Sequence, residues 1–107
     1  MIYKFKSKAG SDVIMLSAHG DQMLTLLGRT PAAKGLVDVP DLAGAITALE
    51  QAVAADEARF VQAQAEAEAA NLPLPRRTGI SLHQRAWPLI ELMRRSQKAG
   101  QPLVWGV

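Results

Sequence analysis

The chain has no cysteine, few aromatic residues and no long apolar run. Without cysteine it can form neither a disulfide nor a thiolate metal site, and it has no cysteine nucleophile. No apolar stretch approaches the roughly 20 residues that a membrane-spanning helix needs. The first residues also lack the apolar segment of a signal peptide. These absences favour a cytoplasmic protein that does not enter a membrane.

A length of 107 residues predicts a single domain over residues 1–107 with a core of modest size. The hydrophobic fraction of 49% is ordinary for a globular protein and argues against disorder. Much of that fraction is alanine, and only five residues are aromatic: Tyr3, Phe5, Phe60, Trp87 and Trp105. The core must therefore be built mainly from leucine, isoleucine, valine and methionine.

The net charge is only +2, but the charges are unevenly distributed. Residues 41–70 carry six acidic side chains and one arginine, whereas residues 71–107 carry six basic side chains and one glutamate. Two interpretations stay open. The acidic and basic segments can pack against each other with complementary rims, or the basic segment can face an acidic partner.

Two N-terminal strands are expected, at residues 2–7 and 13–16, with a turn at residues 9–12 that contains Gly10 and Asp12. Tyr3, Phe5 and Ser7 fall on one face of the first strand and the lysines on the other, which predicts a sheet with one face open to water. Residues 103–107 are β-like and should join this hairpin. Residues 36–39 predict either a short strand or an extended lead-in to a helix.

A short helix is predicted over residues 18–27, with Ser17 as N-cap and Gly28 as the stop. A long helix begins near Pro40 or Asp41, because proline is accepted in the first turn of a helix. Its apolar seam has a 4-3 spacing: Leu42, Ile46, Leu49, Val53, Phe60, Ala63, Ala67 and Ala70.

The seam of the long helix contains only alanine after Phe60 and Val61. Alanine favours helix but buries little area. Residues 62–70 should therefore be helical but weakly anchored. They can project from the body, dock on another copy or fray.

Residues 71–79 form a connector, because Pro73 and Pro75 exclude helix there. Ser81 and Gln84 fit a capping box that opens a last helix. Pro88 lies inside this helix and should kink it, and Gly100 ends it. The fold class is thus α+β: a small antiparallel sheet, made of the N-terminal hairpin and the C-terminal strand, packed by a short helix and an antiparallel pair of longer helices.

Four segments of the chain resemble a bacterial family known as domain of unknown function 1840. They are YKFKSKAGSDVIML at residues 3–16, PAAKG at 31–35, SLHQRAWPLIELMRRS at 81–96 and the terminal VWGV. The resemblance implies a bacterial origin and one domain over the whole chain. It carries no catalytic residue, substrate or cofactor to this sequence.

No catalytic or metal site is predicted, and no cofactor. His19, Asp21 and His83 are the only hint of a metal centre, and their spacing matches no zinc motif. Ser17 and Ser81 are explained as N-caps, and there is no nucleophile elbow or phosphate-binding loop. The paired acids of the long helix have no neighbour in sequence that would raise a pKa.

The remaining candidates form an interaction surface on the C-terminal quarter of the chain. Its members are Trp87, Arg76, Arg77, Arg85, Arg94, Arg95 and Lys98. Trp87 lies off the apolar face of its helix and would cover a sheet edge or anchor an interface. We expect a non-enzymatic protein that binds a protein partner or self-associates as a homo-oligomer, through the long helix or a sheet edge. The alternative is a nucleic-acid-associated protein that uses these basic side chains, with Tyr3 and Trp105 as stacking surfaces.

Overall fold

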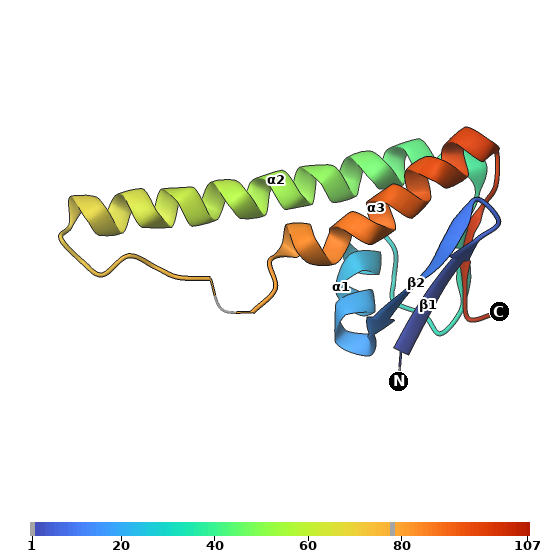
Figure 1. Cartoon of the computed structure of the whole chain (residues 1–107), viewed down its shortest axis with the longest axis horizontal. Helices are drawn as coiled ribbons and strands as arrows, with labels where there is room; N and C mark the ends of the chain where they lie inside the picture. Colours follow the sequence, from blue (N-terminus) through green and yellow to red (C-terminus); the bar gives the residue numbers. More distant parts are fainter. Residues whose placement is uncertain (1, 78) are drawn as a thin grey trace.

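The computed structural model describes residues 2–77 and 79–107 and has the predicted α+β fold. An antiparallel sheet has the strand order β2-β1-β4-β3. Its strands are β1 (Ile2–Ser7), β2 (Gly10–Leu16), β3 (Gly35–Val37) and β4 (Leu103–Trp105). The helices are α1 (Ser17–Leu26), α2 (Val39–Ala69) and α3 (Leu82–Ala99). They pack on one face of the sheet, and α2 continues far beyond it (Figure 1).

The hairpin is tighter than the sequence predicted. The turn consists of Lys8 and Ala9, and β2 begins at Gly10 instead of residue 13. The expected turn at residues 9–12 is therefore wrong in its extent. The hydroxyl of Ser7 accepts the Ala9 N–H at 3.1 Å, which closes the turn one residue earlier.

The C-terminal strand joins the hairpin as predicted, and it lies between β1 and β3. The Trp105 ring is 2% exposed and packs edge-to-face on Phe5, with the ring centroids 5.8 Å apart. Its indole N–H donates to the Ala32 carbonyl at 3.1 Å. Gly35 lies so close to the indole that an added Cβ would come within 2.4 Å of a ring atom. Residues 31–35 therefore pack directly on the terminal strand. Of the two alternatives for residues 36–39, the structure has the short strand, which is β3.

Helix α1 follows β2 without a linker, and this overturns the prediction that Ser17 is its N-cap. Leu16 occupies the cap position in extended conformation and makes no side-chain cap hydrogen bond, so Ser17 is already helical. The helix lies directly on β1. A Cβ added to Gly20 would be 2.0 Å from the Tyr3 ring, and the Tyr3 hydroxyl donates to the Asp21 carboxylate.

Helices α2 and α3 form the predicted antiparallel pair. Asp38 caps α2 by accepting the Val39 N–H at 2.8 Å, and the predicted seam is buried from Leu42 to Val53. The capping box of α3 is present, since Ser81 accepts the Gln84 N–H and Gln84 accepts the Ser81 N–H. Gly100 ends α3 in the left-handed conformation with φ of 67°, as the sequence predicted.

The molecule is elongated because α2 is longer than the body that supports it. The radius of gyration is 15.9 Å and the extents are 51 × 28 × 23 Å, against a radius of about 13 Å for a compact chain of this length. The connector runs back beside the far end of α2 (Figure 1). Thr78, which the sequence placed in this connector, lies outside the described residues.

Candidate interaction surfaces

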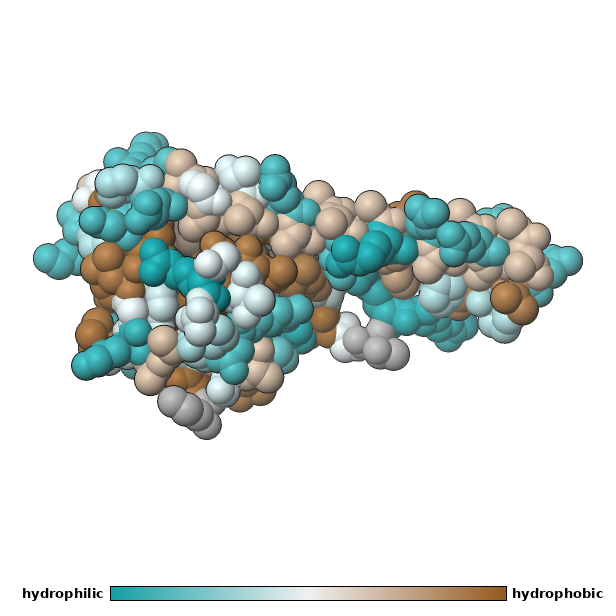
Figure 2. All heavy atoms as spheres, turned by 180° about the vertical axis from the view of Figure 1, so that it is seen from behind, coloured by the Kyte–Doolittle hydropathy of each residue, from teal (hydrophilic) through white to brown (hydrophobic). Residues whose placement is uncertain are grey.

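The far end of α2 projects from the body, and we call residues 57–69 the arm. The last buried residue of the helix is Val53. Of the three alternatives left open for residues 62–70, the structure of the single chain shows a helix that projects from the body and stays helical to Ala69 instead of fraying. In Figure 2 the arm is a narrow extension on which pale alanine surface alternates with hydrophilic side chains.

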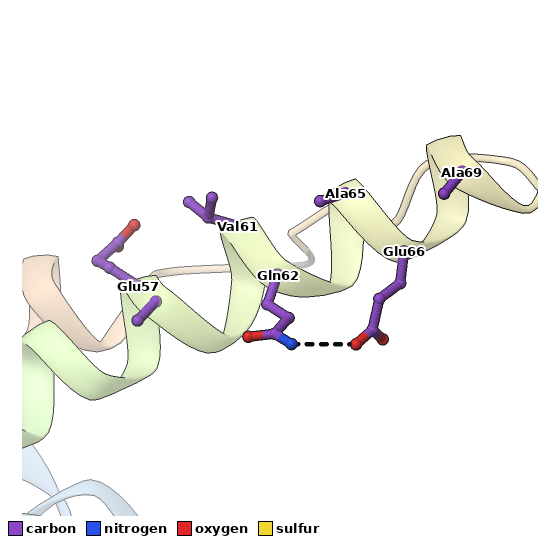
Figure 3. A pocket seen from close by; sticks show the side chains of 7 residues that line it. Glu57, Val61, Gln62, Ala65, Glu66 and Ala69 are labelled. Atoms are coloured by element: carbon purple, nitrogen blue, oxygen red, sulfur yellow. Dashed lines mark hydrogen bonds between the residues drawn. The ribbon is translucent and has the colours of Figure 1, made fainter.

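A shallow, open groove runs along the arm. Its floor is lined by Ala58, Val61, Ala65 and Ala69, and Glu57, Gln62 and Glu66 form its rims. In Figure 3 the Val61 and Ala65 side chains point to the same side, and Gln62 donates to Glu66 at 3.2 Å along one rim. Val61 is 60% exposed. The groove is thus an apolar strip with acidic borders and no covering side chain from the described part of the chain.

The opposite side of α2 is held by the connector. The Arg77 guanidinium lies 3.3 Å from Asp56 and 2.9 Å from Glu57, and its central carbon sits 4.3 Å from the centroid of the Phe60 ring. These contacts explain why Phe60 and Asp56 are half-buried although the body of the protein ends before them. The groove side of the arm is left open.

Arg94 links the two long helices near the body. It lies 2.5 Å from Glu50 of α2 and 2.9 Å from Glu91 of its own helix. Hydrogen bonding to Glu50 raises the pKa of Arg94 further above its ordinary value, with a smaller contribution from Glu91. The acidic α2 and the basic C-terminal segment therefore meet through complementary rims, as the first interpretation of the charge pattern expected.

Trp87 lies on the side of α3 that carries Arg94. It is 43% exposed, stacks on His83 with a centroid distance of 5.4 Å, and has the Arg94 guanidinium 5.4 Å from its ring. The groove beside the edge strand β2 is lined instead by Arg85 and Pro88 of α3. Trp87 is thus not among the residues that line the groove at the β2 edge of the sheet, and its exposed indole remains a candidate interface anchor.

The six predicted basic residues do not form one stripe. Arg76, Arg77 and Arg85 surround a groove at the start of α3, together with Asp56 and Phe60. Arg94, Arg95 and Lys98 lie in the last two turns of α3, with Arg94 bound to two glutamates. The proposed stacking residues are also unavailable, because Trp105 is buried and Tyr3 is stacked on Phe5 on the helix-covered face.

The open face of the sheet is a surface that sequence reasoning recognised only in part. The lysines of β1 were placed on it, but Ile14, Leu16 and Leu36 were not, although each is at least 45% exposed. Cross-strand pairs put Lys4 beside Ile14, and Lys6 beside Val104. The signal was present in the alternation of residues 13–16, in which Val13 and Met15 face the core.

The residues considered for a metal site serve other roles. Asp21 accepts the Tyr3 hydroxyl, and His83 stacks on Trp87. Within residues 2–77 and 79–107, no group of three histidine or acidic side chains is arranged to hold a metal ion. In the same residues, no helix is both long enough and apolar enough to cross a membrane.

Comparison with known proteins identifies the family of this protein. A family model described as Domain of unknown function (DUF1840) matches residues 1–105. The protein therefore belongs to this family, as the resemblance of its segments suggested. No curated protein and no solved structure matches the chain.

Proposed function

We propose that this chain is a non-enzymatic protein that binds proteins, first of all a second copy of itself, through the arm of α2. The observation that carries the proposal is that α2 continues as a helix well past Val53, its last buried residue, with an apolar strip left uncovered. A helix as short as the arm, residues 57–69, is only marginally stable in water on its own. A projecting helix with one free apolar side is suited to docking on another surface.

The exposed apolar side chains around the arm support this proposal. Val61, Leu72 and Leu74 are each more than half exposed, and all three lie on the arm or on the connector beside it. Scattered exposed apolar residues are normal on a soluble protein. These three lie together beyond the last buried residue of α2, and burying them in a complex would stabilise the arm.

The proposal is tested by sedimentation velocity over a range of chain concentrations, with the wild type and two variants. Val61→Glu places a charge in the groove of the arm. Thr47→Glu places the same charge at an exposed residue on the part of α2 that packs on the body, away from the arm. We expect a concentration-dependent dimer that Val61→Glu abolishes and Thr47→Glu keeps. A wild type that is monomeric at the highest reachable concentration would refute the proposal.

A further inference from the structure

The open face of the sheet is a large surface that no helix of the described chain covers. Three rows of side chains cross it. Ile2 pairs with Leu16, Lys4 pairs with Ile14, and Lys6, Val104 and Leu36 form a row over three strands. Ile2, Ile14 and Leu16 are between 55% and 63% exposed. The face thus presents apolar side chains on both sides of two lysines.

The charges on this face indicate which kind of partner it can bind. None of the ion pairs among the described residues involves Lys4, Lys6 or Lys8, and Asp12 is the one acid beside Lys6 in the groove at this end of the sheet. Two such faces packed together would set the central lysines of one copy against those of the other. Like charges placed opposite each other in this way weaken a sheet contact. An acidic, partly apolar occupant fits instead.

The arm has these properties. Glu66 borders its apolar strip and Glu68 lies on the same segment, and none of the ion pairs among the described residues involves either of them. Glu57 also borders the strip, but it is already bound to Arg77. Its alanines would let the helix approach a flat sheet closely. The 13 residues of the arm span about 20 Å, which is enough to cross four strands that together are about 14 Å wide.

We propose that the open sheet face binds the acidic arm of a second copy, and that two copies exchange arms reciprocally. This inference rests on the proposed self-association and names the surface that receives the arm. Each copy has one arm and one open sheet face. In a two-fold dimer each arm therefore binds the sheet face of the other copy, and no binding surface is left for a third chain. Arm-on-arm pairing is disfavoured, because it would bring Glu66 and Glu68 of one copy near the same acids of the other.

The absence of cysteine makes the contact directly testable by disulfide trapping. Ala65→Cys marks the arm and Ile14→Cys marks the sheet face. When the two variants are mixed and mildly oxidised, we expect a disulfide between unlike chains and little between like chains. Trapping of Ala65→Cys with itself, or of Ile14→Cys with itself, would overturn the inference while leaving self-association intact. A chain that stays monomeric would overturn both.

A charge exchange supplies the second measurement. The pair Lys4→Glu and Lys6→Glu, or the pair Glu66→Lys and Glu68→Lys, should each weaken dimerisation by about tenfold or more. An equimolar mixture of the two double variants should restore the affinity. Lys98→Glu, on α3, is the control and should keep the wild-type affinity. Failure of the mixture to associate better than either double variant alone would contradict the pairing of arm and sheet.

Discussion

The Tyr3 hydroxyl donates a hydrogen bond to the Asp21 carboxylate, and this contact ties the first strand to the first helix. Gly20, next to Asp21, makes the approach possible because it has no side chain to meet the tyrosine ring. The hydrogen bond to Asp21 raises the pKa of Tyr3 above its ordinary value of 10.0, and desolvation and the charge of Asp21 act in the same direction.

The raised pKa of Tyr3 can be observed directly, because Tyr3 is the only tyrosine of the chain. The native state favours the neutral phenol, so this contribution to stability is complete below pH 10.0 and is lost as the pH rises through the raised pKa. Ultraviolet titration should give a higher midpoint for the folded chain than for the chain in urea. Asp21→Asn should lower the folded midpoint. Equal midpoints in the folded and unfolded chains would contradict the contact.

Alanine substitutions at two glycines inside helices should change the free energy of unfolding in opposite directions. Gly20→Ala forces a Cβ into the Tyr3 ring and should lower the free energy of unfolding by roughly 1–3 kcal/mol. A Cβ added to Gly44 in α2 has no atom within 4 Å. Gly44→Ala should therefore raise the free energy of unfolding by about 0.5–1 kcal/mol, since alanine is the better helix former. Urea denaturation measures both. A stabilising Gly20→Ala would show that α1 does not lie on β1 as described.

Two valines of α2 test where the support of that helix ends. Val53 is buried, and Val53→Ala should cost about 1–3 kcal/mol of unfolding free energy. Val61 is exposed, and Val61→Ala should change the stability of the monomer by no more than about 0.5 kcal/mol. The comparison requires dilute protein, so that association does not contribute. Equal losses at the two positions would mean that the arm is packed within one chain.

Binding to generic DNA or RNA should be weak and should depend little on salt. Arg77 and Arg94 are already bound to carboxylates, so fewer cations are available to replace the counterions of a phosphate backbone. Fluorescence anisotropy at two salt concentrations measures this. Tight binding that weakens steeply with salt, and that is lost in Arg95→Glu with Lys98→Glu, would favour the nucleic-acid alternative.

Local signals in the sequence predicted the helices well. The capping box at Ser81 and the stop at Gly100 are formed by residues close together in the chain, so they could be recognised without the fold. The loss of large side chains after Val61 predicted a weakly anchored helix, because helix propensity and burial can both be estimated from the residue types, but it left the projection of the arm as one of three alternatives.

Features that depend on distant residues could not be predicted in the same way. The bond between Arg94 and Glu50 joins residues 44 positions apart, and it exists only because α2 and α3 pair in this register. The start of α1 was missed because β2 ends at Leu16, directly before the helix, so Leu16 takes the cap position and Ser17 is already helical. The apolar open face emerges only when Ile14, Leu36 and Val104 are brought together by the strand order.

Hydrogen exchange of the α2 amides at low and high chain concentration tests the central claim most directly. Residues 58–69 do not pack on the core of a single chain, so their backbone amides should exchange fast at low protein concentration. Protection of these amides should rise with concentration, whereas amides of residues 42–53, already buried, should not change. Arm amides whose protection stays the same at every concentration would contradict the claim that the arm binds a second copy.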